Sequence, residues 1–256
     1  MNSPEFSQNN PNQEIFTSPN STVQFIIRTL GHEKVQELSD FADALEREPS
    51  KDIDLEQYVK DFRHTLSWQD AENLKSYTNR SYKYVNAIAR GIWDYEELGP
   101  KTPDRTREYE ALSEDVSQII TNSPKLPETI KTFRGTNLDQ FRSYGISTVE
   151  QLQNLQGQLF YEAGFTSTSL DEAGSFYGKS NAGFYRKDCN IEIEYRIPSG
   201  CNAGIPLADD ALSFYAKDEA EFLIDKDSIF KILSVETQEG KAHIKMALLP
   251  KKLWNS

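Results

Sequence analysis

The sequence contains little cysteine and no long apolar run. Its 256 residues include two cysteines, Cys189 and Cys201, at the ends of a predicted strand over 190–197. A strand rises about 3.3 Å per residue, so its ends lie too far apart for a disulfide unless the chain doubles back. We therefore expect two free thiols.

No apolar run approaches the roughly 20 residues that a membrane-spanning helix needs, and no charged-then-apolar signal peptide follows Met1. We expect no membrane span. The protein then either stays in the cytoplasm, or it leaves by a signal that is removed or of a non-cleaved type.

Several cofactor and metal motifs are also missing. The chain has no Gly-rich dinucleotide fingerprint, no phosphate-loop lysine motif and no Cys-x-x-Cys. Its three histidines, His32, His64 and His243, are scattered and show no ligand spacing. The sequence therefore predicts no metal, although three dispersed histidines remain free to meet in space.

Basic residues are fewer than acidic ones: the chain has 28 Lys and Arg and 40 Asp and Glu, which gives a net charge of −12. Nucleic-acid binders and proteins of anionic membranes carry basic surfaces, so both classes are disfavoured. A local basic site for one small phosphate ligand is still compatible with this balance.

The chain changes character along its length. Residues 1–20 are rich in Asn, Ser, Pro and Gln and predict a disordered tail. Residues 21–256 are expected to form a single domain, helical over about 21–125 and built of strands over about 126–250. Helices first and strands later indicate an α+β fold. The expected strands are 129–134, 158–168, 190–197, 203–207, 220–225, 228–235 and 241–249, with short helices at 137–143, 148–155 and 171–177.

One helical segment is dense in aromatic residues. Ser67 and Asp70 predict a capping box that opens it, and Tyr77, Tyr82 and Tyr84 follow. They predict either an aromatic packing face or a surface that stacks on a flat ligand.

Two short motifs lie in the strand-rich part. Arg134 followed by Gly135 ends the first predicted strand, where glycine would let the backbone turn and guanidinium suits a phosphate. Further on, strand alternation places Ser167 and Ser169 on one face and Thr168 on the other. Alone, the arginine motif is more typical of a surface turn, and the serine motif of an edge strand or a helix cap.

A third motif contains two acids, Glu219 and Glu221. If 220–224 is a strand, both carboxylates lie on the same face of it. Two neighbouring carboxylates repel each other, so such a pair usually binds a cationic group. Glu192 and Glu194 have the same spacing, which is typical of a half-buried strand with a solvated acidic face. What distinguishes Glu219 and Glu221 is a preceding loop with aromatic residues.

Arg134, then Ser167 to Ser169, then Glu219 and Glu221 together resemble the arginine–serine–glutamate class of mono-ADP-ribosyltransferases. The catalytic domains of bacterial binary toxins, of the iota toxin and vegetative insecticidal type, are the most similar. The segments 77–91, 126–135 and 196–205 resemble the same family, so the likeness covers roughly 70–250. It implies a helical N-terminal segment packed on a two-sheet β-sandwich core.

The resemblance implies cleavage of NAD at the nicotinamide bond and transfer of ADP-ribose to a protein side chain, without a metal. Glu221 would stabilise the ribosyl cation and bind the ribose 2′-hydroxyl. Ser167 would hold Glu221, and Arg134 would contact a phosphate of NAD. Glu219 would select an arginine acceptor, because a carboxylate pairs with guanidinium and can help deprotonate it.

Further residues receive roles from the resemblance alone. Phe214 and Tyr215 would touch the target protein, and Phe184 and Arg186 would clamp and contact NAD from the loop 171–189. Tyr185 or Lys187 are alternatives for those two roles, because the spacing matches loosely. The remaining NAD-binding residues would be Tyr77, Asn86, Gly135 and Thr168.

The expected product is an arginine-modified target protein, actin being one candidate, and the enzyme would act as a monomer. The chain shows no second domain of the binary-toxin kind, so we expect a secreted or translocated toxin or effector in a host cytosol. Alternatives are a phage-type enzyme of the bacterial cytoplasm, a NAD glycohydrolase with water as main acceptor, and a binding module without activity.

Overall fold

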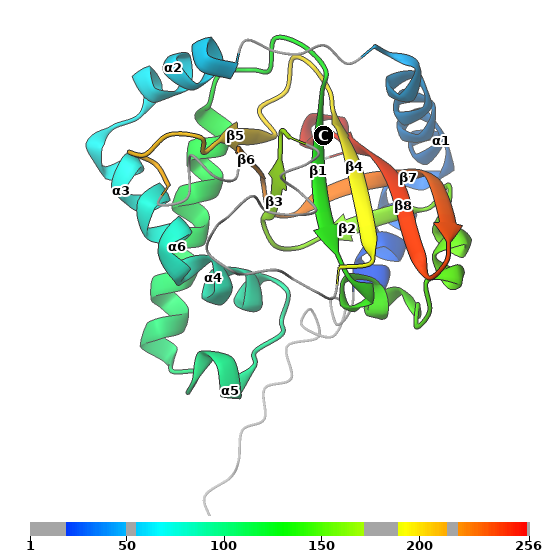
Figure 1. Cartoon of the computed structure of the whole chain (residues 1–256), viewed down its shortest axis with the longest axis horizontal. Helices are drawn as coiled ribbons and strands as arrows, with labels where there is room; N and C mark the ends of the chain where they lie inside the picture. The colour runs from blue at the N-terminus through cyan, green and yellow to red at the C-terminus, as the bar shows by residue number, and fades with distance from the viewer. Residues whose placement is uncertain (1–18, 50–54, 172–188, 214–219, 255–256) are drawn as a thin grey trace, which may run out of the picture.

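The computed structural model describes residues 19–49, 55–171, 189–213 and 220–254. Helices fill the first half of the described chain and strands the second, which confirms the α+β prediction (Figure 1). The predicted tail falls mostly outside the described residues, although its last two residues already belong to the first helix.

The helices begin and end at residues with recognisable caps. They are α1 (Pro19–Arg47), α2 (Leu55–Thr65), α3 (Trp68–Ser76), α4 (Tyr82–Ala89), α5 (Tyr95–Leu98) and α6 (Pro103–Asn122). Ser67 and Asp70 form the predicted capping box at the start of α3. Thr102 caps α6, with Pro103 in its first turn. Between α3 and α4 the chain makes one π-helical turn, η1 (Tyr77–Ser81).

All the described strands belong to one mixed sheet. They are β1 (Ile130–Thr136), β2 (Leu159–Glu162), β3 (Thr166–Ser169), β4 (Ile191–Ile197), β5 (Gly204–Pro206), β6 (Glu221–Ile224), β7 (Ser228–Gln238) and β8 (Lys241–Leu249). Their order is β2-β7-β8-β4-β1-β3-β6-β5, with β4 and β8 parallel. The single strand predicted over 158–168 is two strands, because the chain turns at Gly164 and changes its neighbours in the sheet.

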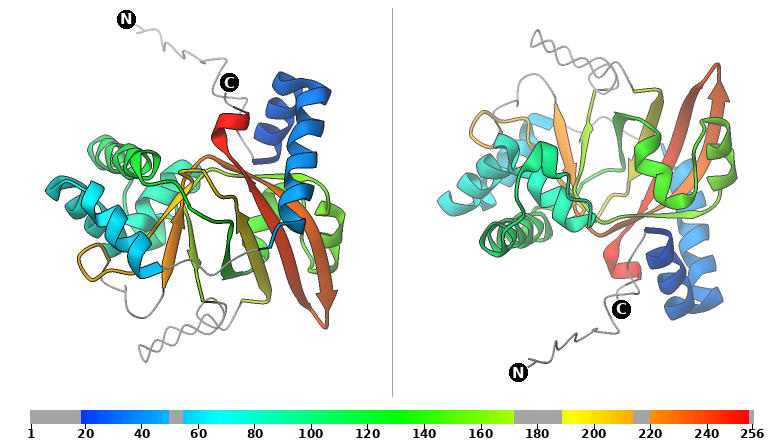
Figure 2. Two further views of the ribbon diagram at one scale, coloured as in Figure 1. Left: turned by 90° about the horizontal axis from the view of Figure 1, so that it is seen from above. Right: turned by 90° about the horizontal axis from the view of Figure 1, so that it is seen from below.

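The predicted two-sheet sandwich is therefore one hydrogen-bonded sheet that bends sharply. In the part of the chain that the structure describes, one residue pair, Phe133 with Ser169, joins β1 to β3. On either side of this junction lie two well-paired halves, which diverge in Figure 2. A core cluster fills the bend and takes residues from both halves, including Tyr195 on β4 and Phe222 on β6.

Helices cover the two outer faces of the bent sheet (Figures 1 and 2). Phe62 and Leu74 from α2 and α3 pack with Leu223 of β6 in one cluster. On the opposite side, Leu38 of α1 packs with Ile229 of β7 in another. The site described below lies where the helical cover of β6 meets the junction of β1 and β3.

Charged residues fasten α1, which bends at Gly31, to the sheet. Lys231 on β7 is buried and donates to Ser39 Oγ at 2.7 Å and to Asp43 at 2.6 Å. Arg196 on β4 donates from Nη1 to the carbonyls of Leu45 and Glu48, at 3.2 and 2.9 Å. These carbonyls lie at the C-terminal end of α1, where a cation is favourable.

The strand with Glu192 and Glu194 does not carry the solvated acidic face that the sequence predicts. Glu194 is buried and lies 3.2 Å from Lys131 and 3.4 Å from Arg196. Burying a carboxylate is costly unless it is paired, and two cations supply the pairing here. The partner Lys131 lies on β1, so the local alternation of β4 could not reveal it.

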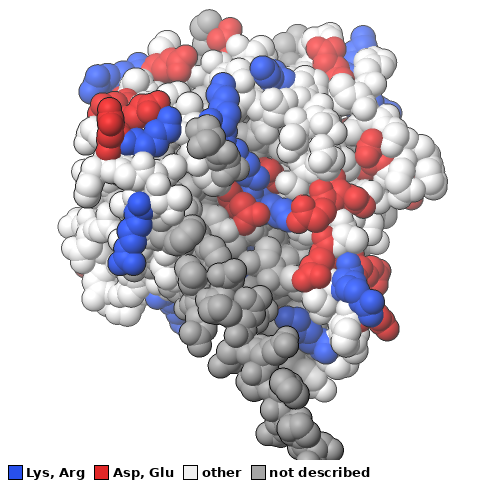
Figure 3. All heavy atoms as spheres, turned by 180° about the vertical axis from the view of Figure 1, so that it is seen from behind, with Lys and Arg blue, Asp and Glu red and all other residues white. Residues whose placement is uncertain are grey.

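The expected short helices at 137–143 and 148–155 are 3₁₀ helices, η2 (Leu138–Tyr144) and η3 (Glu150–Leu155). The one expected at 171–177 falls almost wholly outside the described residues. Among the described helices, none is long and apolar enough to cross a membrane. On the face shown in Figure 3, acidic and basic groups lie interspersed, without a continuous basic surface.

Replacing Gly204 with alanine should destabilise the bent sheet. An added Cβ would lie 2.4 Å from Phe222 Cε1 and 2.7 Å from the Leu223 carbonyl oxygen. Such crowding costs about 1–3 kcal/mol of the free energy of unfolding, measured by chemical denaturation. Gly200→Ala is the control: its φ of 70° strains alanine but no atom lies within 4 Å, so it should cost about 1 kcal/mol. Equal losses would contradict the close approach.

The two cysteines are both free, as the sequence predicts, and should differ in reactivity. Burial raises the pKa of the Cys201 thiol to about 11, whereas Cys189 is only half-buried. Because the thiolate is the reactive form, Cys201 in the native protein should react with a disulfide reagent at pH 8 roughly 100-fold more slowly than a free thiol. A Cys189→Ser variant isolates it, and fast native labelling of that variant would contradict the burial.

Candidate active site

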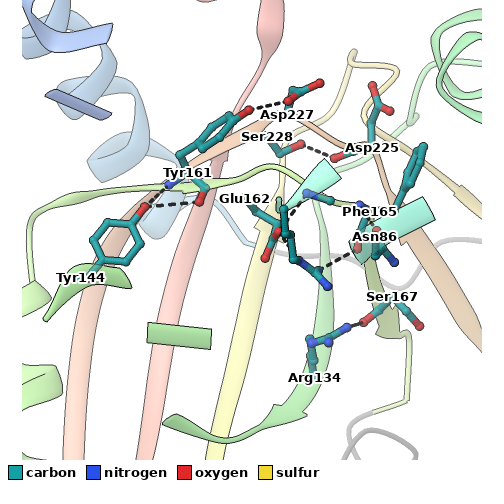
Figure 4. Close-up of polar contacts among 12 residues, drawn as sticks. Asn86, Arg134, Tyr144, Tyr161, Glu162, Phe165, Ser167, Asp225, Asp227 and Ser228 are labelled. Carbon is teal, nitrogen blue, oxygen red and sulfur yellow. Dashed lines mark hydrogen bonds and ion pairs between the residues drawn. The ribbon is translucent and has the colours of Figure 1, made fainter. Parts of the chain in front are cut away.

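The site begins at the junction of the two half-sheets, where an arginine side chain crosses the bend. Arg134 lies on β1 opposite Ile193, and its Nη1 donates to the carbonyl oxygen of Ser167 at 2.7 Å (Figure 4). A guanidinium has donors on several edges, so this bond fixes one edge of a group that can bind an anion with another. The structure thus brings together two of the residues that the sequence singled out.

Gly135 does not play the part that the sequence predicted. The strand β1 continues through Gly135, which pairs with Glu192, and ends only at Thr136. The backbone therefore makes no sharp turn after Arg134. The hydrogen bond to Ser167, rather than a glycine turn, directs the arginine side chain.

The strands β3 and β6 set the position of Glu221. Ser169 lies opposite Glu221 and Ser167 opposite Leu223, so these four side chains share a face. Glu221 is 8% exposed. Thr168 lies on the other face, where its hydroxyl donates to the Phe222 carbonyl at 2.7 Å. The alternation predicted for the serine motif is therefore present, and the Thr168 hydroxyl does not join Ser167.

Ala220 interrupts the strand just before Glu221. The strand β6 begins at Glu221, and Ala220 has a φ of 41°, in the left-handed region. Its carbonyl accepts a hydrogen bond from the Leu170 amide at 3.0 Å. Such backbone strain in a residue other than glycine is enriched at functional sites. Strand alternation therefore stops at Glu221, and it cannot be used to aim Glu219.

Tyr77 and Asn86 approach the same face from the helices. Tyr77 is buried in the π-helical turn and lies edge-on to Phe165, with ring centroids 5.3 Å apart. Burial, and after it the charge of Glu221, raise the pKa of the Tyr77 phenol. Asn86 donates from Nδ2 to Tyr77 Oη at 3.3 Å. π-Helical turns are frequent at functional sites, and this one lies near the Glu221 carboxylate.

The aromatic segment provides the predicted packing face, and its stacking on a flat ligand stays a prediction. Tyr77 lies near Glu221, whereas Tyr84 stacks on Tyr109 at a centroid distance of 4.6 Å in a packing cluster of α4 and α6. Tyr82 is partly exposed.

Sequence reasoning missed two charged residues next to the site. Arg90 at the end of α4 donates from Nε to Glu162 Oε1 at 2.8 Å. Burial alone would lower the pKa of the Arg90 guanidinium, but the charge and hydrogen bond of Glu162 raise it. Arg90 follows Asn86 by four residues, so the helical spacing marked it as a neighbour, whereas no local pattern marked Glu162.

Five predicted site residues lie outside the described part of the chain. They are Phe184, Arg186, Phe214, Tyr215 and Glu219, and with them the alternatives Tyr185 and Lys187. Their roles stay predictions.

The arrangement combines a buried carboxylate, a serine-rich strand and an arginine that spans the junction. A carboxylate stabilises positive charge that develops on a bound molecule and accepts a hydrogen bond from a hydroxyl. A guanidinium binds a phosphate. Within the described ranges, no three His, Cys, Asp or Glu side chains gather as metal ligands would. The site therefore suits a phosphorylated molecule with a carbon centre that becomes cationic.

The chain is similar to known proteins both in sequence and in fold. A model of the ADP-ribosyltransferase exoenzyme family matches residues 55–252. Among solved structures, C3stau2 from S. aureus with NAD has a TM-score of 0.59 at 20% identity, covering 80% of this chain and 100% of that one.

Two other solved structures show the same fold. The enzymatic component C2-I of the C2 toxin from Clostridium botulinum has a TM-score of 0.56 at 18% identity, covering 78% of this chain and 48% of that one. The ADP-ribosyltransferase Vis in complex with agmatine has a TM-score of 0.51 at 18% identity, covering 83% and 92%. A search of curated proteins gave no match.

The family match spans most of the chain and contains Arg134, Ser167 and Glu221, the residues on which the resemblance rested. The chain belongs to the ADP-ribosyltransferase exoenzyme family.

Proposed function

We propose that the protein cleaves NAD and transfers ADP-ribose to an arginine side chain of another protein. The observation that carries the proposal is the placement of Glu221, buried at the start of β6 opposite Ser169, beside a strand whose Ser167 carbonyl holds Arg134. In this assignment Arg134 contacts a phosphate of NAD, and Glu221 faces the nicotinamide ribose.

The reaction breaks the bond between ribose C1′ and the nicotinamide nitrogen, and nicotinamide leaves with the bonding electrons. The sugar becomes oxocarbenium-like, and the Glu221 carboxylate stabilises that charge while it accepts a hydrogen bond from the 2′-hydroxyl. In this assignment Ser167 would hold the Glu221 carboxylate, with which it shares a face of the sheet, although Ser169 is the residue directly opposite Glu221. An arginine nitrogen then bonds to C1′ and gives up one proton.

The acceptor is assigned through Glu219. A carboxylate there pairs with the incoming guanidinium and takes the proton that bond formation releases. Phe214 and Tyr215 would contact the target protein. Vis, which shares the fold, was solved with agmatine, a guanidinium compound, which supports arginine-like acceptors as the first to test.

The target would be a host protein, actin being one candidate, reached by a secreted or translocated monomeric enzyme. Two alternatives use the same site: a NAD glycohydrolase with water as the main acceptor, and a phage-type enzyme that modifies a bacterial protein. All three need Glu221, and only transfer needs a protein acceptor.

Conservative substitutions of the glutamates test the assignment. Glu221→Gln should lower kcat for NAD cleavage about 100- to 1000-fold, because the transition-state charge loses its counter-charge. Glu219→Gln should abolish transfer to agmatine while NAD hydrolysis continues. Nicotinamide release and ADP-ribosyl-agmatine formation are measured in parallel.

Glu192→Gln is the matched control, because Glu192 and Glu194 repeat the same spacing on β4. It should keep both activities. If Glu192→Gln loses activity and Glu221→Gln does not, the assignment is wrong. In a cell lysate with labelled NAD, arginine attachment predicts label that hydroxylamine releases. Label that only a cysteine-directed mercury reagent releases would contradict the arginine acceptor.

The Arg134→Lys variant tests the phosphate contact. Lysine keeps the charge but loses the planar fork and the hold on the Ser167 carbonyl, so KM for NAD should rise about tenfold or more. Arg107→Lys serves as control and should leave KM unchanged, because this exposed arginine contacts neighbours in its own helix, Asp104 and the Pro103 carbonyl. An unchanged KM for Arg134→Lys would contradict the contact.

A further inference from the structure

The turn between β2 and β3 carries the chain from one half of the bent sheet to the other. β2 pairs with β7, whereas β3 pairs with β1 and β6. Three residues, 163–165, make this crossing, and Ser167 follows two residues later. Whatever fixes this turn therefore fixes where β3 enters the site.

The Ala163 carbonyl of the turn accepts a hydrogen bond from the Asp227 amide at 3.3 Å, whereas side chains satisfy the backbone at Gly164 and Phe165. Glu162 Oε1 accepts from the Gly164 amide at 3.0 Å, and Asn86 Oδ1 accepts from the Phe165 amide at 2.8 Å. Arg90 Nη2 donates to the Phe165 carbonyl at 3.4 Å. Buried peptide groups need such partners, so α4 and Glu162 together hold the turn in place (Figure 4).

The approach of α4 to the turn leaves no room for a side chain at Gly164. A Cβ there would lie 2.6 Å from Asn86 Oδ1 and 3.1 Å from Arg90 Cζ. The helix and the turn are thus in direct contact. A displacement of Arg90 or Asn86 would be passed directly to the backbone of the turn.

The Glu162 carboxylate keeps Arg90 in this position. Its side chain is 7% exposed, and that of Arg90 is 32% exposed. A buried carboxylate and its guanidinium partner hold each other, because either one alone would bear an uncompensated desolvation cost. Without Glu162, the Arg90 side chain has room to swing toward solvent, and the Gly164 amide loses its acceptor.

The turn and the side chains that hold it are linked to both Arg134 and Glu221 of the proposed site. Downstream of the turn, the Ser167 carbonyl holds Arg134. On the side of Glu221, Asn86 donates a hydrogen bond to Tyr77, and the charge of Glu221 contributes to the raised pKa of the Tyr77 phenol. The turn is therefore linked to Ser167, which holds Arg134, and to Tyr77, which lies near Glu221.

We propose that Glu162, acting through Arg90, is a positioning residue for the NAD reaction. The pair holds the turn at Gly164 and Phe165, and the turn sets the distance between Arg134 and Glu221. This inference rests on the proposed function, since its readout is NAD cleavage.

A double-mutant cycle on the full chain tests it, with kcat and KM for NAD cleavage and the thermal midpoint measured for every variant. Glu162→Ala should lower kcat/KM about 100-fold, the size expected for a small misplacement of reacting groups. Glu162→Gln should recover to about tenfold below wild type, because its amide oxygen accepts the same two hydrogen bonds but carries no charge. The double variant Glu162→Ala/Arg90→Ala should be within about twofold of Arg90→Ala.

Asp43→Ala is the control, because it removes the partner of the buried Lys231 on the α1 side of the sheet. It should lower the thermal midpoint and keep kcat/KM within about twofold of wild type. That separates loss of stability from loss of positioning.

Two results overturn the positioning role while the proposed function stands: Glu162→Ala as active as wild type, or single losses that multiply in the double variant. If Glu162→Ala does not fold at the assay temperature, Glu162→Gln decides, and wild-type kcat/KM in that variant overturns the inference. A wild-type protein that consumes no NAD overturns both.

Discussion

The structure depends on how two well-paired half-sheets are joined where they share almost no backbone hydrogen bonds. The pair of Phe133 with Ser169 links β1 to β3, and the hydrogen bond from Arg134 to the Ser167 carbonyl joins the same two strands. A junction with few ladder bonds leaves polar groups available for other partners. The proposed site lies at this junction, where few ladder hydrogen bonds form.

Two groups of buried or partly buried charges have different structural roles. Lys231, Arg196 and Glu194 lie under α1 and fasten a helix to the sheet. Arg90 at the end of α4 and Glu162 at the end of β2 fasten a turn beside the proposed site. In both sets the pairing joins elements far apart in sequence, and removing one partner would leave the other uncompensated.

The sequence predicts what is local and leaves out what is long-range. Periodicity located most strands, the capping box at Ser67, and the shared face of Ser167 and Ser169, because these depend on near neighbours. It placed one strand over 158–168, since the turn at Gly164 depends on contact with α4. Periodicity also predicted a solvent-exposed Glu194, because its partner Lys131 lies on another strand. Ala220 carries no sequence mark of its left-handed backbone.

The position of α1 bears on where the chain can be cut. The family match starts at residue 55, after α1 ends. Yet α1 covers Ile229, Leu233 and Leu249, which would otherwise form an apolar area on the outer face of β7 and β8. A fragment trimmed to the matched region would keep the residues of the site and lose the cover of its outer face. The cover of this apolar area therefore resides in a helix that lies outside the family match.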